Sequence, residues 1–104
     1  MGGSDEVTMV LHRAPEAARL AGITVARLRS SDLATLRRYE AAGLVAPARQ
    51  RGRVRYYTTA QVALLRRIRR LHEELGVNLA GVEIILRLLA RLEAGALEPP
   101  PRVR

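Results

Sequence analysis

The hydrophobic residues of this chain recur mostly at helical spacing, with one stretch of extended character between the helices. An apolar run follows Pro15, a favoured residue of a first helical turn, and stops at Gly22, which predicts a short helix over about 15–21. The next segment, 24–42, is also rich in helix-forming residues and ends at Gly43. Together they predict two helices joined by a tight turn.

Residues 47–57 have a different pattern. Arginine alternates with other residues there, and Val54 and two tyrosines favour extended structure. Gly52 suits the turn between two short arms, so we expect a small β-hairpin.

Two further helices are predicted after the hairpin. Thr58 and Gln61 have the spacing of a capping box at a helix start. The apolar side of this helix repeats at helical spacing and consists of Leu64, Ile68, Leu71 and Leu75. Asn78 is placed to cap a last helix over about 79–94, with Gly95 as its stop.

The order of these elements predicts a mainly α fold, a winged helix-turn-helix with a small β-hairpin wing and a C-terminal dimerisation helix. In such a module the second helix enters the major groove of DNA and the first crosses the backbone. We expect the domain to span 13–97, between a flexible N-terminal tail, 1–12, and a Pro/Arg C-terminal tail, 98–104.

Charge strengthens the DNA interpretation. The chain has 18 basic residues, all of them arginine, against 10 acidic ones, for a net charge of +8. The excess lies in residues 13–70, which hold 14 arginines and three acidic residues. Such a segment is an electrostatic footprint for a polyanion, the alternative being a solvated basic face.

Composition excludes several classes of protein. A chain without cysteine has no disulfide framework, thiolate metal site or cysteine nucleophile. His12 and His72 stand alone in the sequence, so we expect no metal and no cofactor. Paired catalytic carboxylates, a phosphate-binding Gly loop and a catalytic triad are all missing, which argues against an enzyme. No membrane span or signal peptide is recognisable, and a soluble, cytoplasmic, nucleoid-associated protein is expected.

The second helix carries the residue types best suited to DNA. Arginine reads guanine bidentately and also binds phosphates, and hydroxyl groups add contacts to bases or phosphates. The expected contacts are Thr35, Arg37, Arg38 and Tyr39. The alternative is that Leu36 and Tyr39 both belong to the core.

Two other arginine groups differ in expected role. In the hairpin, Arg49, Arg51, Arg53 and Arg55 alternate with other residues, which puts several cations on one face of an extended arm. The distance between these cations matches that between phosphates of a nucleic-acid backbone, so we expect them to bind phosphates. The alternative is a charged edge that blocks strand pairing. A solvated helix face is expected for Arg66, Arg67, Arg69 and Arg70, and Glu73 and Glu74, four residues beyond Arg69 and Arg70, are placed to pair with those two. The alternative for this group is DNA contact.

The last helix is apolar around more than half of its circumference, which a small domain cannot cover alone. Coiled-coil spacing connects Val82, Ile85, Leu89 and Leu92. We expect these residues to form a homodimer contact, the alternative being a core helix of a monomer.

Several motifs together resemble the MerR family of bacterial transcription regulators, over about residues 15–90. The matching segments are Ala17–Gly22, Thr35–Glu40, Gly43–Pro47 and Arg55–Thr58. A further segment, Gly76–Glu83, is similar to the signature of the family's heat-shock repressors.

The resemblance implies a homodimeric repressor that binds an inverted repeat of double-stranded DNA upstream of chaperone genes. It also implies release on heat stress, with the DnaK chaperone as a partner and co-repressor. The family's DNA contacts carry over to Thr35, Arg37, Arg38 and Tyr39 and, in the wing, to Arg55 and Tyr57. Family members that sense metals use cysteines, and those that sense drugs add a C-terminal domain, so we expect no effector sensing by this chain itself.

One feature departs from the family. The distance from Gly22 to Leu36 is about eight residues longer than usual, and Val25–Asp32 resembles Leu33–Glu40 as an imperfect duplication. Either the recognition helix is long or one copy forms a loop, and we favour the second copy as the reading helix, with Arg27 and Arg29 as alternative contacts. The alternative function is a protein-interaction or chaperone-binding adaptor with only non-specific DNA affinity.

Overall fold

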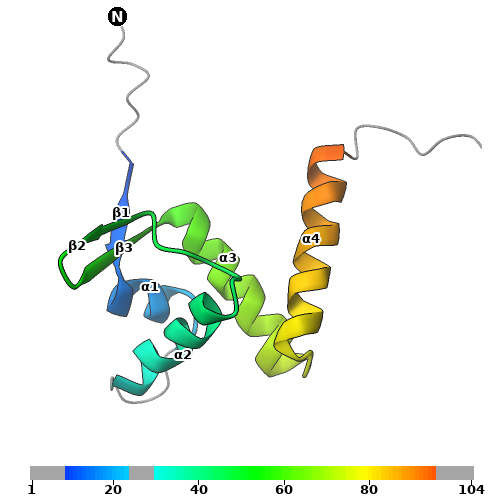
Figure 1. Cartoon of the computed structure of the whole chain (residues 1–104), viewed down its shortest axis with the longest axis horizontal. Coiled ribbons are helices and arrows are strands. Elements are labelled where there is room, and N and C mark those ends of the chain that lie inside the picture. Colours follow the sequence, from blue (N-terminus) through cyan, green and yellow to red (C-terminus); the bar gives the residue numbers. More distant parts are fainter. Residues whose placement is uncertain (1–8, 24–29, 96–104) are drawn as a thin grey trace, which may run out of the picture.

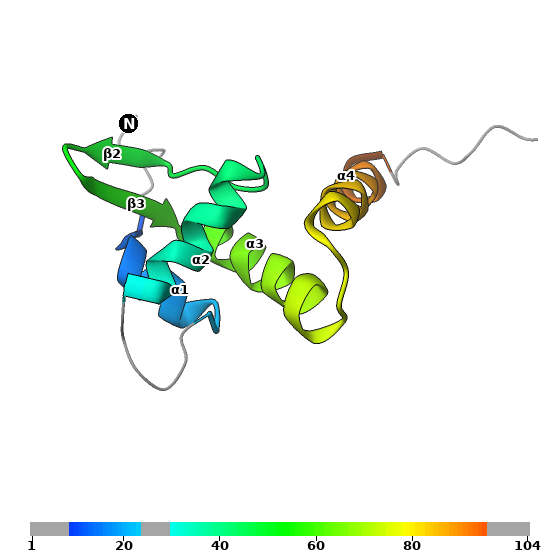
Figure 2. The ribbon, with the colours of Figure 1, turned by 60° about the horizontal axis from the view of Figure 1, so that its bottom comes forward.

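The computed structural model describes residues 9–23 and 30–95 of the chain. Helices dominate it, with a small sheet at one end and a projecting last helix at the other (Figures 1 and 2). The elements in order are β1 (Leu11–Arg13), α1 (Ala14–Leu20), α2 (Ser30–Ala41), β2 (Arg49–Arg51), β3 (Val54–Thr58), α3 (Thr59–Arg69), a π-helical turn (Arg70–Glu74) and α4 (Leu79–Gly95). Within the described ranges, no helix has the length and apolar character needed to cross a membrane.

Local signals in the sequence explain most helix boundaries. The Thr58 hydroxyl accepts from the backbone N–H of Gln61, whose side chain accepts from the backbone N–H of Thr58, so the predicted capping box is present. The Asn78 side chain accepts from the backbone N–H of Gly81 at 2.7 Å and caps α4 as expected. After α2, Gly43 adopts a φ of +79°, a left-handed conformation that ends a helix readily only at glycine.

The sheet is antiparallel with the strand order β1-β3-β2. Strands β2 and β3 form the predicted hairpin around Gly52, which has a φ of +61°. Strand β1 was not predicted: Leu11 and His12, assigned to a tail on sequence alone, pair with Thr58 and Tyr57 of β3. A three-residue strand has no periodicity of its own, and it is stabilised by a partner strand whose paired residues lie 43 to 47 positions away.

The end of α3 departs from a regular helix. In the π-helical turn the backbone N–H of Leu75 bonds to the carbonyl of Arg70, five residues earlier, at 3.0 Å. The extra residue in this turn rotates the chain that follows by about 100°. The prediction that Leu75 continues the apolar side of the helix is therefore wrong, and its side chain is 70% exposed.

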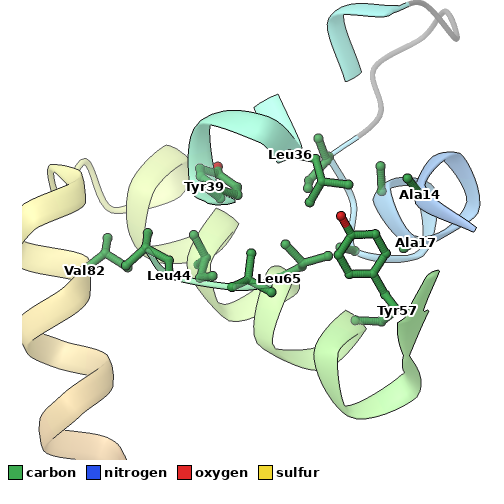
Figure 3. Close-up of a cluster of buried hydrophobic side chains, with 14 residues drawn as sticks. Ala14, Ala17, Leu36, Tyr39, Leu44, Tyr57, Leu65 and Val82 are labelled. Atoms are coloured by element: carbon green, nitrogen blue, oxygen red, sulfur yellow. The ribbon is translucent and has the colours of Figure 1, made fainter. Parts of the chain in front are cut away.

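The core lies between the sheet, α1, α2 and α3 and extends to the base of α4 (Figure 3). Its fully buried large side chains are Tyr39, Tyr57, Leu36, Leu65, Ile68 and Val82. The chain has no Phe or Trp, so tyrosines provide the aromatic part of this core.

Helix α2 contains the whole second copy of the duplication, Leu33–Glu40. Most of the first copy, including Arg27 and Arg29, lies outside the described residues, as do most of the N-terminal tail and the C-terminal tail.

Shortening a core side chain should destabilise the protein, whereas shortening the exposed side chain that follows the π-helical turn should not. We expect Leu65→Ala to lower the free energy of unfolding by about 2–5 kcal/mol, because Leu65 is fully buried. Leu75→Ala removes the same atoms from an exposed position and should change it by less than about 0.5 kcal/mol. Urea denaturation of both variants measures the difference, and equal losses would contradict this description of the core.

Candidate nucleic-acid interface

Helix α2 is two-sided. Leu36 and Tyr39 are fully buried, whereas the side chains between them, Arg37 and Arg38, are exposed. Helical geometry produces this division, because residues three apart share a side of the helix and the two between them point elsewhere. Thr35 is partly buried and already engaged in an interaction. The structure therefore leaves Arg37 and Arg38 as the outward cations of this helix.

Two tyrosines expected at the DNA surface are core residues instead. Tyr39 has no exposed surface, and its hydroxyl donates to Glu73 Oε2 at 3.4 Å. Tyr57 is equally buried, and its hydroxyl donates to Glu40 Oε2. Neither side chain can reach DNA from these positions, so the prediction of DNA contact by Tyr39 and Tyr57 is not kept.

Glu40 connects helix α2 to the wing, the hairpin of β2 and β3. Besides accepting from Tyr57, its carboxylate pairs with Arg55 Nη2 at 3.4 Å. Tyr57 and Arg55 both lie on β3, so one partly buried carboxylate at the end of α2 holds two neighbouring positions of the hairpin. Glu40 carries no signal in the sequence, because its partners lie 15 and 17 residues away and no local pattern marks them.

The wing arginines divide into two groups. Arg49, Arg51 and Arg53 are exposed on β2 and in the turn that follows it. Arg55 is only 21% exposed at its side chain and is paired with Glu40. The first three can reach a phosphate backbone without breaking an ion pair that the structure records, whereas Arg55 mainly holds the hairpin in place.

Arginines of α3 stabilise the end of α1 instead of forming only a solvated face. Arg66 Nη2 donates to the carbonyl of Leu20 at 2.8 Å, and Arg69 Nε donates to the carbonyl of Ala21 at 3.0 Å. The last carbonyls of a helix lack partners within the helix and carry partial negative charge, which guanidinium groups satisfy well. Arg66 and Arg69 thereby lock the first helix of the helix-turn-helix onto α3.

The expected pairing of the α3 arginines with acidic residues four positions further on is shifted by one residue. Arg69 Nη2 pairs with Glu74 Oε2 at 3.0 Å, five positions later, because the π-helical turn adds a residue. Arg67 Nη1 pairs with Glu93 Oε2 on α4 at 3.5 Å.

The apolar surface that α4 exposes differs from the dimer contact expected from the sequence. It includes more residues and lies further around the helix. Val82 is fully buried in the core of its own chain, so it is not available to a partner. Leu92 is 61% exposed, and Ile85 and Leu89 are partly buried. Two exposed residues missing from the expected set, Ile84 and Leu88, lie one helical turn apart before Leu92. We call Ile84, Ile85, Leu88, Leu89 and Leu92 the free apolar face of α4.

Burial perturbs the two core tyrosines. Loss of hydration, followed by the negative charge of Glu73, raises the pKa of Tyr39 to about 12. Burial and the hydrogen bond to Glu40 raise the pKa of Tyr57 as well. Both hydroxyls therefore stay protonated and act as donors at neutral pH.

No group of three or more potential metal ligands occurs among residues 9–23 and 30–95. His12 lies against Glu16 Oε1 and Thr59 Oγ1, each at 3.2 Å, where it links β1 to the starts of α1 and α3.

Comparison with known proteins agrees with this geometry. Residues 31–89 match the family described as MerR HTH family regulatory protein. The chain is also 43% identical over 67 residues to the "Putative heat shock protein HspR" of Streptomyces coelicolor, a match that covers 62% of this chain and 44% of that protein. This chain thus matches less than half of the length of that relative. No solved structure matches the chain.

The buried tyrosines predict instability at high pH. Below pH 10 tyrosine is protonated in both the folded and the unfolded chain, but between pH 10 and about 12 the unfolded chain loses the proton that Tyr39 keeps. The free energy of unfolding should fall by about 1 kcal/mol at pH 11 on account of Tyr39. Urea denaturation at pH 8 and 11 should show a smaller fall for Tyr39→Phe than for the matched control Tyr56→Phe. Identical falls in both variants would contradict this role of Tyr39.

Proposed function

The chain belongs to the MerR family of helix-turn-helix regulatory proteins, and on this premise we propose that it is a sequence-specific, DNA-binding repressor of heat-shock and chaperone genes. As a member of a family of regulators, it is not an enzyme. The observation that carries the DNA-binding proposal is the division of α2, with Arg37 and Arg38 outside and Leu36 and Tyr39 inside. The similarity to a heat-shock protein supports the choice of target genes.

In the proposed complex α2 lies in the major groove. Arg37 or Arg38 reads a guanine edge, the other binds a phosphate, and Thr35 adds a contact at the rim of the groove. The exposed wing cations Arg49, Arg51 and Arg53 bind the flanking phosphates, for which their spacing along an extended strand is suited. Because Glu40 ties β3 to α2, the wing and the reading helix approach the DNA as one body.

We propose a second copy of this chain as the partner of the free apolar face of α4. That face carries no charge of its own; Glu83 and Arg87 occupy the other side of the helix, and Arg91 lies at the edge of the face, next to Ile84. An apolar surface of this kind is covered best by an identical surface related by two-fold symmetry. Two-fold symmetry in turn predicts an operator that is an inverted repeat.

The protein acts in the cytoplasm, on the DNA of the nucleoid. The DnaK chaperone, implied by the family resemblance, is the proposed co-repressor. Heat stress would remove it from the complex and release repression.

A binding titration tests this function. Wild-type protein should bind an inverted-repeat chaperone-promoter fragment about 10³–10⁷-fold more tightly than a scrambled fragment of equal length at constant salt. Arg37→Ala should weaken specific binding by about 1–3 kcal/mol and relax the preference at one base position. Arg87→Ala, which removes the same charge from the polar side of α4, where its recorded partner is Glu83 of the same helix, is the matched control and should bind like wild type.

Equal, weak and salt-sensitive binding to both fragments would reject the repressor proposal. It would favour the protein-interaction or chaperone-binding adaptor instead. Unchanged affinity of Arg37→Ala for every operator variant would reject the base-reading role of that residue alone.

The homodimer has its own test. Leu89→Arg places a charge within the free apolar face of α4 and should produce a monomer with weaker operator binding. Ala94→Arg introduces the same side chain on the opposite, polar side of the helix and should leave the dimer intact. Sedimentation velocity distinguishes the two states, and a Leu89→Arg protein that stays dimeric would refute this interface.

A further inference from the structure

The π-helical turn between α3 and α4 is bonded to both helices of the helix-turn-helix. Glu73 Oε2 accepts from the hydroxyl of Tyr39 on α2 at 3.4 Å. Glu74 Oε2 pairs at 3.0 Å with Arg69, whose Nε donates to the carbonyl of Ala21 at the end of α1. Of two successive carboxylates, Glu73 thus bonds directly to α2 and Glu74 acts on α1 through Arg69.

The π geometry brings these groups together. In a regular α-helix a residue five positions later lies about 140° around the axis, so Arg69 and Glu74 would point in different directions. A turn closed by a five-residue backbone bond, as from Leu75 to Arg70, brings positions i and i+5 onto one side. The irregular turn is therefore a condition for the ion pair of Arg69 with Glu74.

Helix α4 is attached to the body of the protein through its first half, where Leu79 and Leu86 pack against the core beside Val82. The structure describes α4 over its whole length, and Val82 is its one buried residue. The pair of Arg67 with Glu93 joins two side chains that are 48% and 63% exposed, and such pairs contribute little. Figures 1 and 2 show α4 starting next to the π-helical turn and standing apart from the sheet, on the opposite side of the molecule.

Contacts of His72 also hold the π-helical turn in place. The ring of Tyr39 meets the ring of His72 edge to face at 6.0 Å, and His72 Nδ1 donates to the carbonyl of Val77 at 3.0 Å. Helix α4 is about 25 Å long, so a tilt of about 10° at its start moves its end by about 4 Å. The contacts of the turn, together with the packing of Leu79, Val82 and Leu86, therefore hold the direction of α4 relative to α2.

We propose that Glu73 and Glu74 are positioning residues that fix the angle between α4 and the helix-turn-helix and so set the half-site spacing that a dimer accepts. This inference rests on the proposed function, in which α4 joins two copies and α2 reads DNA. In a two-fold dimer the angle between these helices sets both the separation and the relative rotation of the two reading helices. Two extra base pairs rotate a half-site by about 70° and move it by about 7 Å, so a rigid dimer discriminates against them.

The test measures affinity for a series of inverted repeats that differ only in the number of central base pairs. Wild-type protein should prefer one spacing sharply. Tyr39→Phe removes the bond between α2 and Glu73, and Glu74→Ala removes the ion pair that orients Arg69 at the end of α1. In the double variant the ratio between the affinity for the best spacing and that for its neighbours should fall about fivefold or more. Glu83→Ala removes the same charge from α4, where its recorded partner is Arg87 in the same helix, and should keep the wild-type ratio.

The ratio of affinities for different spacings is informative because a change in the charge of the protein alters the affinity for every repeat alike. Such a change therefore cancels in the ratio. A wild-type protein that binds no inverted repeat would overturn the proposed function and this inference with it. A wild-type protein with a sharp preference that the double variant retains would overturn this inference alone.

A measurement without DNA gives an independent answer. The chain has no cysteine, so Ala34→Cys at an exposed position of α2 provides a single site for a spin label. The distance between the two labels of a dimer should be narrowly distributed in the otherwise wild-type protein and broad after Tyr39→Phe with Glu74→Ala. A merely destabilised protein would keep the narrow distribution below its melting temperature, and that result would overturn the proposal.

Discussion

The burial of two tyrosine hydroxyls is the constraint on which the rest of this structure depends. The chain has no Phe or Trp, so Tyr39 and Tyr57 are the largest side chains of the core. A buried hydroxyl without a partner is costly, and each tyrosine donates to a carboxylate, Glu73 or Glu40. These bonds tie α2 to the π-helical turn on one side and to the wing on the other. A small core is thereby extended into a rigid DNA-binding head.

The same constraint explains why arginines of similar sequence context have different roles. Arg55, Arg66 and Arg69 each bond to another part of the chain, either to a carboxylate or to the carbonyl groups at a helix end. Arg37 and Arg38, for which the described residues record no such bond, have exposed side chains. Residue type is uniform along the basic segment, so the surroundings alone separate structural arginines from those free to bind a polyanion.

Much of the architecture was predictable because its signals are local. Glycines after α1 and α2, the capping box at Thr58 and the cap at Asn78 each depend on residues within four positions of one another. The two-sidedness of α2 also follows from helical periodicity, although the sequence left open whether Tyr39 faces inside or outside. Membership of a regulator family was likewise readable from motifs that span most of the domain.

The sequence by itself determined the order of the helices, the hairpin and the location of the basic segment, since periodicity, caps and charge act over a few residues. Only the tertiary structure decided that Leu11–Arg13 forms a strand, that Tyr57 and Val82 are core residues, and that Leu75 is exposed. Each of these depends on a partner far along the chain or on one extra residue in a helical turn. Neither has a local pattern, because both result from the packing of elements that are already formed.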